Sequence, residues 1–238
     1  MDGQAVPFSF DPSTGTLTAA LSGLSPSLHQ ITVTAADCCG NLGRDSVTLS
    51  SSAPQTPFAD MGSHWARDYT GRLNELGVIT GVQVGKETYF YPNRSITRGD
   101  FALMTARWMG LNLEDYENVT LPYADESSIP SWSRNAVKAL YELEIMQGSK
   151  AADGKLYANA TASITRAEAM TILGRLQAKG YPEAPLSSFS DAVSIPAWAQ
   201  SHVATLVGLQ VVSGSDGKLR PNDTVTRAEV AKMLFTLW

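Results

Sequence analysis

The sequence predicts a mainly α-helical protein with a small β segment at its amino-terminal end. Two observations lead to this prediction. One pattern of apolar and helix-capping residues occurs three times between Phe58 and Trp238, with the spacing of helices. Before residue 54, short stretches alternate apolar with polar residues, which is typical of antiparallel strands. The length of 238 residues fits one or two compact units.

Composition and charge exclude several classes of protein. Hydrophobic residues make up 43% of the chain and charged residues 17%, close to globular averages, so a collagen-like or wholly disordered chain is not expected. No apolar stretch approaches the roughly 20 residues that cross a bilayer, so we expect no membrane insertion. The net charge is -5 and the 18 Lys and Arg residues are scattered, so we expect no nucleic-acid partner. The first residues lack the features of a signal peptide, and we expect any export signal to lie upstream.

Cysteine and histidine usage predicts neither a disulfide framework nor a metal site. Cys38 and Cys39 are adjacent, which is a poor geometry for bridging each other. The three histidines, His29, His64 and His202, do not cluster in the sequence. Neighbouring carboxylates are better explained as caps and loops than as an acid and base pair. We therefore expect no metal, no cofactor and no catalytic activity in this chain.

The amino-terminal segment is predicted to contain four short strands, at residues 8–11, 16–18, 31–34 and 46–50. A Pro- and Ser-rich break follows, and we place a spacer at 1–53 and a linker at 54–57. About 50 residues give only a marginal core, so this segment is interpreted as the tail of a larger β-sandwich. Residues 31–41 resemble the closing strands of bacterial immunoglobulin-like domains, which are usually spacers.

The first half of each repeat predicts an amphipathic helix. An aromatic residue, any residue and an aspartate open the repeat, and a tryptophan follows within seven residues. Leucines stand eight and eleven residues past each tryptophan, positions that return to one helical face. A glycine stands sixteen residues past it, where we expect a turn or helix end with positive φ. These residues are Asp60, Asp125 and Asp191; Trp65, Trp132 and Trp198; Leu73, Leu140 and Leu206; Leu76, Leu143 and Leu209; and Gly81, Gly148 and Gly214.

The second half of each repeat predicts a helix that begins after a threonine. Thr165 and Thr226 are each followed three residues later by a glutamate, which is the capping-box pattern, whereas Thr97 is followed by the shorter Asp100. An arginine occupies the first helical position in all three copies: Arg98, Arg166 and Arg227. A cation is mildly unfavourable at the positive end of a helix dipole, so its repetition indicates a use.

Two interpretations of these arginines stay open. An arginine beside the free N–H groups of a helix start can bind a carboxylate, such as that of an acidic sugar. Alternatively, each arginine pairs with an acidic neighbour, such as Asp60, Asp125 or Asp191, and only stabilises the fold. The tryptophans either seal the core or present a flat face to a sugar ring. Gly148–Ser149 and Gly214–Ser215 could also bring backbone N–H groups close to a ligand.

The repeated elements together resemble the surface-layer homology (SLH) domain family. The resemblance covers 58–238 and includes Phe90-Tyr-Pro92 and Leu219-Arg-Pro221 before the Thr-Arg pairs. It implies a pseudo-threefold helical bundle of repeats at 58–110, 123–180 and 189–238. It also implies an exported protein that is anchored to the bacterial cell wall or surface layer by a secondary cell-wall polymer, often a pyruvylated saccharide, in grooves between repeats.

Repeat one departs from the family pattern. It has Gly99 and Asp100 where alanine and glutamate are usual, and Val82 where the other repeats have Ser149 and Ser215. Repeat two lacks the proline before its threonine. We expect the groove that relies on the loop of repeat one to bind differently or not at all.

Three hypotheses for function remain from the sequence. The first is a non-catalytic anchor that binds cell-wall polysaccharide. The second is the tether of an enzyme whose catalytic domain lies upstream. The third is a protein-interaction module that self-associates in a surface layer.

Overall fold

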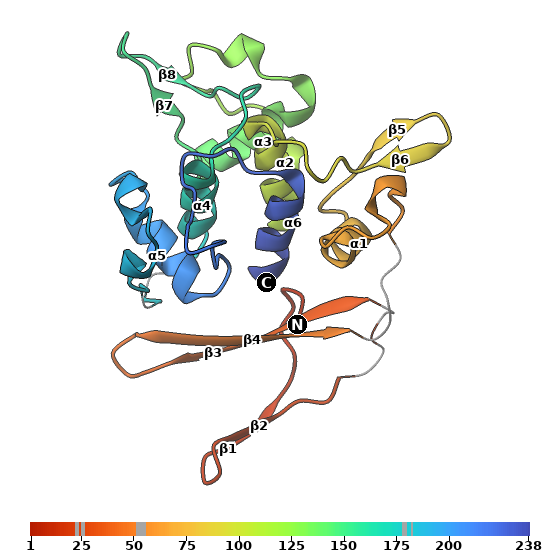
Figure 1. The fold of residues 1–238 in the computed structure, drawn as a ribbon, viewed down its shortest axis with the longest axis vertical. Coiled ribbons are helices and arrows are strands. Elements are labelled where there is room, and N and C mark those ends of the chain that lie inside the picture. Colours follow the sequence, from red (N-terminus) through yellow and green to blue (C-terminus); the bar gives the residue numbers. More distant parts are fainter. Residues whose placement is uncertain (22–23, 25–26, 51–55, 178–179, 182) are drawn as a thin grey trace.

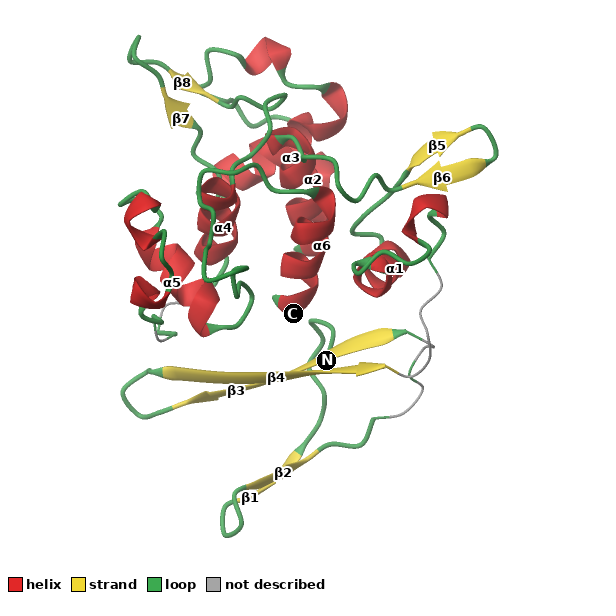
Figure 2. Ribbon diagram, in the orientation of Figure 1, coloured by secondary structure: helices red, strands yellow, loops and turns green. Residues whose placement is uncertain are grey.

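The computed structural model describes residues 1–21, 24, 27–50, 56–177, 180–181 and 183–238. Among these residues, six α-helices and four two-stranded antiparallel sheets occur (Figures 1 and 2). Helices account for 34% of the described residues and strands for 19%. The predicted mainly α class is therefore wrong, and the fold is mixed. The error has two causes: strands of two or three residues are too short to show alternation, and the strands at Leu28–Ala36 and Leu42–Ser50 are longer than predicted.

Each repeat contains two helices, and the second helix of one repeat packs against the first helix of the next. Accordingly α2 packs on α3, α4 on α5, and α6 on α1, which gives the contacts a cyclic order. In Figure 1 the second helices lie toward the middle of the repeats. The first helices are α1 (Arg67–Glu75), α3 (Ser131–Glu142) and α5 (Gln200–Gly208), and the second helices are α2 (Arg98–Trp108), α4 (Arg166–Arg175) and α6 (Arg227–Thr236).

A closed cycle of main-chain hydrogen bonds joins the three repeats just before the second helices. The N–H of Ile96 donates to the carbonyl of Val225 at 3.0 Å, and the N–H of Val225 donates to the carbonyl of Ile164 at 3.1 Å. The N–H of Ile164 closes the cycle by donating to the carbonyl of Ile96 at 3.1 Å. All three side chains are buried in the core. The cycle therefore holds the amino-terminal ends of α2, α4 and α6 around one centre.

The predicted threonine caps are present, and they differ between repeats. Thr165 and Thr226 form complete capping boxes with Glu168 and Glu229. Thr97 accepts a hydrogen bond from the N–H of Asp100 at 3.1 Å, but a capping box is not formed. The side chain of aspartate is one methylene shorter than that of glutamate, which leaves it short of the N–H of the cap.

The first helices bury a narrower face than the spacing predicts. Leu73, Leu140 and Leu206 are fully buried, as expected. The expectation that the tryptophans share this face is wrong: Trp65, Trp132 and Trp198 are 54%, 62% and 55% exposed. In repeats one and three the helical spacing does not apply, because α1 and α5 begin after their tryptophans, whereas Trp132 lies in the first turn of α3 and is exposed there. Leu76 and Leu143, which follow the last helical residue, are also exposed.

The conserved spacing of the glycines has a packing cause. The first helices end several residues earlier, and Gly81 does not have positive φ, so the expectation of a helix end there is wrong. Gly148 and Gly214 do have positive φ, of 73° and 69°. A Cβ atom at Gly81 would lie 2.8 Å from the ring of Phe58, and one at Gly214 would lie 2.9 Å from Phe189. The aromatic residue that opens each repeat therefore requires the glycine.

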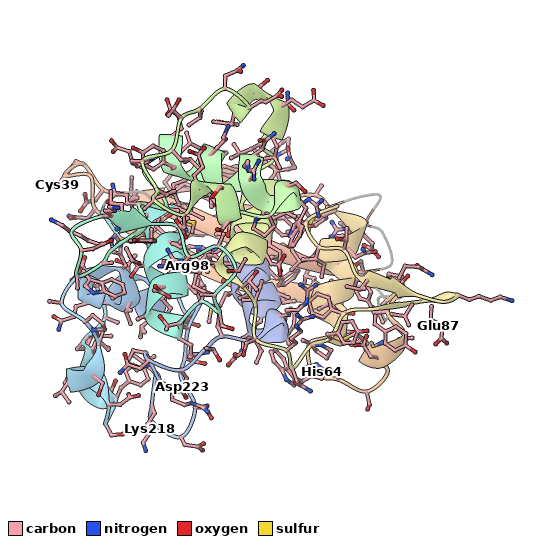
Figure 3. The ribbon with its side chains drawn as sticks, turned by 90° about the horizontal axis from the view of Figure 1, so that it is seen from above. Cys39, His64, Glu87, Arg98, Lys218 and Asp223 are labelled. Carbon is pink, nitrogen blue, oxygen red and sulfur yellow. The ribbon has the colours of Figure 1, made fainter. Side chains whose placement is uncertain are left out.

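Short hairpins occupy the loops between the two helices in repeats one and two. Strands β5 (Val82–Val84) and β6 (Glu87–Tyr89) form one, and β7 (Ser149–Lys150) and β8 (Leu156–Tyr157) form the other. In repeat three a single bridge pairs Ser215 with Lys218. Figure 3 shows the β5–β6 hairpin, with Glu87 labelled, projecting away from the helices.

The amino-terminal segment contains two separate hairpins at the predicted strand positions. They are β1 (Ser9–Asp11) with β2 (Thr16–Thr18), and β3 (Leu28–Ala36) with β4 (Leu42–Ser50). The described residues do not form a sandwich, and the likeness to an immunoglobulin-like domain is not confirmed. Residues 51–55, which include the first part of the predicted linker, lie outside the described residues.

The β3–β4 hairpin packs against the repeats at the carboxyl-terminal end of α6 (Figure 1). The guanidinium of Arg44 donates hydrogen bonds to the carbonyl oxygens of Thr236 and Trp238 at 2.9 and 2.8 Å. The carboxylate of Asp2 lies 2.7 Å from both Nη2 of Arg72 and Nδ1 of His29. These contacts connect the amino-terminal segment to α1 and α6.

Candidate functional site

Each of two repeated arginines reaches from its own repeat into the following one. Nη1 of Arg98 lies 2.8 Å from Oε1 of Glu168, and Nη1 of Arg166 lies 2.8 Å from Oε1 of Glu229. Arg98 is 5% exposed and Arg166 9%, so both arginines are buried, whereas the side chains of Glu168 and Glu229 are 25% and 33% exposed. Burial lowers the pKa of Arg166, and the charge of Glu229 opposes that shift. The partner is therefore the capping glutamate of the next repeat.

Arg98 and Arg166 pair with an acidic neighbour, as one interpretation expected, but the partner is a glutamate and not one of the opening aspartates. The carboxylate of Asp125 accepts hydrogen bonds from the N–H groups of Ala158 and Asn159, each at 2.8 Å. The carbonyl of Ala158 in turn accepts from Nε of Arg98 at 2.9 Å. One peptide thus connects the aspartate of repeat two with the arginine of repeat one. The same arrangement occurs in the other two copies. Asp191 accepts hydrogen bonds from the N–H groups of Leu219 and Arg220, and the carbonyl of Leu219 accepts from Arg166. Asp60 accepts from the N–H groups of Phe90 and Tyr91, and the carbonyl of Phe90 accepts from Arg227.

The aspartates fix the loops in a constrained conformation. The second residue that each one binds lies in the left-handed region, with φ of 57° at Tyr91, 50° at Asn159 and 51° at Arg220. Burial acts to raise the pKa of Asp191, but hydrogen bonds from the N–H groups of Leu219 and Arg220 outweigh it and lower the pKa. The aspartates are thus part of the scaffold that positions the arginines.

A pocket of about 360 Å³, here called groove 1, opens beside Arg98 (labelled in Figure 3). It draws its lining from all three repeats: Arg98 from the first, the Gly148–Ser149 backbone and Glu168 from the second, and Trp198 from the third. Its full lining is Arg98, Met146, Gln147, Gly148, Ser149, Lys150, Glu168, Thr171, Ile172, Arg175 and Trp198.

A second pocket of about 340 Å³, here called groove 2, has an equivalent construction one repeat further on. It combines Arg166 of repeat two, Gly214, Ser215 and Glu229 of repeat three, and Trp65 of repeat one. Its full lining is Trp65, Arg166, Val211, Val212, Ser213, Gly214, Ser215, Arg220, Glu229, Lys232 and Met233. The structure therefore brings together an arginine, a Gly–Ser pair and an exposed tryptophan in each of two pockets, and all of these residues are among the candidate site residues from the sequence.

The third interface, between repeats three and one around Arg227, is different. Arg227 forms no ion pair with any described residue. Its Nε donates to the carbonyl of Phe90 at 2.8 Å and its Nη2 to that of Thr80 at 3.1 Å. Asp100, which stands where the other repeats have glutamate, instead accepts a hydrogen bond from the indole N–H of Trp132 at 3.0 Å. Gly81 packs against Phe58 and belongs to neither groove 1 nor groove 2.

Sequence reasoning missed several polar residues of the grooves. Glu168 and Glu229 were recognised as caps but not as partners of the arginines, because their pairing crosses from one repeat to the next. Four more cations line the grooves: Lys150, Arg175, Arg220 and Lys232. They occupy positions at which the repeats have different residues, so the comparison of repeats gave no signal for them.

The described residues contain no group of three or more His, Cys, Asp or Glu side chains placed to hold a metal ion. Their helices also include none with the length and apolar character of a membrane span. Cys38 and Cys39 are exposed free thiols at the turn between β3 and β4.

Several known proteins are similar to this chain. An amylopullulanase of Thermoanaerobacterium thermosulfurigenes is 31% identical over 76% of this chain and 9% of that protein. The exoglucanase XynX of Acetivibrio thermocellus is 29% identical over 83% of this chain and 18% of that protein. A surface-layer 125 kDa protein of Lysinibacillus sphaericus is 30% identical over 78% of this chain and 15% of that protein. The chain thus spans less than a fifth of each of these relatives.

One protein-family model matches all three repeats. The model of the S-layer homology domain matches residues 57–102, 122–170 and 188–231, one segment for each repeat. Each segment begins with the opening aromatic and aspartate and includes the first turn of a second helix. The matches cover more than half of the sequence, and the chain belongs to the S-layer homology domain family.

Proposed function

We propose that this chain binds an acidic cell-wall polysaccharide in grooves 1 and 2 and thereby anchors a larger exported protein to a bacterial wall. The observation that carries the proposal is the repeated combination of cations, a Gly–Ser backbone and an exposed tryptophan in a pocket built from three repeats. The binding is an equilibrium recognition without catalysis.

The chemistry of the grooves suits a charged sugar. The exposed ring of a tryptophan offers a flat apolar face to a pyranose, while its indole N–H is free to meet a hydroxyl group. A hydrogen bond to a charged group contributes about 1.5 to 3 kcal/mol. If both grooves engage one polymer, the second contact becomes intramolecular, and avidity rises about a hundredfold or more.

Family membership supports the cellular setting of this proposal. The S-layer homology domain is a non-catalytic module that anchors proteins to the cell wall, which places this chain outside the cell at the wall. The named relatives include enzymes and a surface-layer protein, and each is much longer than this chain. We take the shared part to be the anchor and the remainder to be cargo that differs between proteins.

The exposed tryptophans allow a direct test. Trp65→Ala and Trp198→Ala should each weaken binding to purified cell-wall polysaccharide about fivefold in calorimetry, since a stacked ring contributes about 1 kcal/mol. Phe10→Ala is the matched control, because Phe10 is an equally exposed aromatic on the β1–β2 hairpin. Undiminished affinity in the double tryptophan variant would overturn the proposed site.

A second measurement separates an anchor from a lattice-forming module. Wall preparations that retain their polysaccharide should sediment this chain, and preparations stripped of it should not. Equal retention by both preparations would favour protein–protein assembly, as in a surface layer, over recognition of sugar.

A further inference from the structure

We infer that grooves 1 and 2 each receive a saccharide segment with two negative charges, and that cations at positions that differ between the repeats recognise them. The inference rests on the proposed function and makes its ligand more specific. It starts from the charge that each groove retains after its internal ion pair is formed.

The motif arginines contribute little net charge to a ligand. Arg98 is paired with Glu168 at 2.8 Å, and its Nε is bonded to the carbonyl of Ala158. Arg166 has the equivalent partners Glu229 and Leu219. A guanidinium that already faces a carboxylate in a largely buried setting is compensated, so it attracts a second anion less strongly. The recognising charge must therefore come from other residues.

Each groove retains two cations beyond that pair. Lys150 and Arg175 line groove 1, and Arg220 and Lys232 line groove 2. None of the four forms an ion pair with a described residue. With three cations and one carboxylate in its lining, each groove has a net charge of about +2, although the whole chain has -5. Positive charge is thus concentrated in the two grooves, where it attracts anions.

Duplication of the repeat does not explain these four cations. Repeat three has Asp216 where repeat two has Lys150, and Thr236 where repeat two has Arg175. Repeat two in turn has Asn159 and Thr171 at the positions equivalent to Arg220 and Lys232. The two grooves have the same excess of positive charge, but the residues that provide it stand at different positions of the repeat. Duplication of one ancestral repeat therefore does not account for this charge.

The third interface has a different set at these positions. The equivalent residues in repeat one are Gln83, Tyr91, Leu103 and Arg107, which include one cation instead of two. We therefore confine the doubly anionic ligand to grooves 1 and 2. Lysine acts as a point charge, whereas arginine presents a planar fork, so each groove offers one contact of either kind. Carboxylates and phosphodiesters both satisfy this chemistry.

The test uses the whole chain, and calorimetry measures its affinity for polysaccharide purified from Gram-positive cell walls. The double variant Lys150→Gln with Lys232→Gln should lose at least tenfold in affinity and show a weaker dependence on NaCl concentration. Lys86→Gln is the control, because this lysine lies in the β5–β6 turn, outside both grooves. Thermal unfolding of the three proteins checks that the substitutions leave the fold intact.

The outcomes separate this inference from the proposed function. If wild-type protein does not bind the polysaccharide, both fall. If it binds and the double variant binds equally well, only the inference is overturned. A polysaccharide whose carboxylates have been amidated with a carbodiimide identifies the anion. Loss of wild-type binding assigns carboxylates, whereas retained binding that still depends on the two lysines assigns phosphodiesters.

Discussion

Glu168 performs two tasks with one carboxylate. Its Oε2 accepts a hydrogen bond from the N–H of Thr165 at 2.9 Å, and its Oε1 lies 2.8 Å from Nη1 of Arg98 in the preceding repeat. The residue that caps its own helix therefore also joins two repeats. Glu229 acts in the same way on Thr226 and Arg166, at 2.8 Å in both contacts.

Removal of Arg98 should destabilise the fold through the partners it leaves behind. Arg98→Ala leaves the carbonyl of Ala158 without this donor and Glu168 without its cation. We expect the free energy of unfolding to fall by about 3 kcal/mol, the lower end for a broken buried pair, because Glu168 retains partial exposure. Denaturant unfolding measures the loss.

Arg227→Ala is the matched comparison for that substitution. It removes hydrogen bonds to two carbonyl groups but leaves no carboxylate without its ion partner. The loss of stability should therefore be smaller than for Arg98→Ala. Equal losses from the two variants would contradict the assigned role of the ion pair.

Asp100→Glu should stabilise the chain. The longer side chain can reach both the N–H of Thr97 and the guanidinium of Arg227, as Glu168 and Glu229 do in their repeats. We expect a gain of about 1 kcal/mol, the usual size of a capping contribution, partly offset by loss of the hydrogen bond from Trp132. Asp100→Asn, which lacks the charge and the added length, should not stabilise. A denaturant midpoint no higher for the glutamate variant than for the asparagine variant would argue against this account.

Gly148→Ala should destabilise more than a glycine substitution that meets only backbone strain. A Cβ atom at residue 148 would overlap the ring of Tyr123, and its φ is 73°. Gly77 has the same φ of 73°, but nothing lies within 4 Å of its added Cβ. We expect Gly77→Ala to cost about 1 to 2 kcal/mol from the left-handed conformation alone, and Gly148→Ala to cost more. Thermal unfolding of the two variants should rank them in that order.

Contact between the amino-terminal segment and the repeats should weaken in acid. Burial acts to raise the pKa of Asp2, but hydrogen bonds from His29, the N–H of Gln30 and Arg72 outweigh it and lower the pKa below the ordinary 3.8. A lowered pKa means that the ionised carboxylate stabilises the folded state above pH 3.8, and that this stability is lost as the pH falls through the folded-state value. The loss should appear in unfolding measured from pH 5 downward. Asp2→Asn should reduce that part of the pH dependence, and an unchanged profile would contradict it.

The parts of the fold that the sequence predicted are those encoded locally. Thr165 and Glu168 form a capping-box pattern that predicts a helix start from four consecutive residues. Burial of Leu73 was predicted from the helical spacing of apolar residues. The order in which the repeats pack is not encoded locally. Arg98 is 70 residues from Glu168, and the sequence around either residue does not predict their pairing. The β7–β8 hairpin was missed for a related reason: two-residue strands depend on Tyr123 and Asp125, which fix the loop from outside.

The sequence predicted the repeated residues of the candidate site but not the additional cations that give it a positive charge. Repetition identified the arginines, tryptophans and Gly–Ser pairs, which the folded chain collects into two pockets. It also indicated that repeat one is atypical at Asp100 and Val82. It could not identify Lys150 or Arg220, because residues that differ between copies look like ordinary surface variation until the pockets are known.

The main-chain cycle through Ile96, Val225 and Ile164 closes only when all three repeats are present. Loss of a terminal repeat from a linear array removes one interface between repeats, whereas loss of one repeat from this ring removes two of its three interfaces. Groove 1 and groove 2 also take lining residues from every repeat, so deletion of any one repeat would open the cycle and remove part of both pockets. The three repeats should therefore fold and unfold together as one unit.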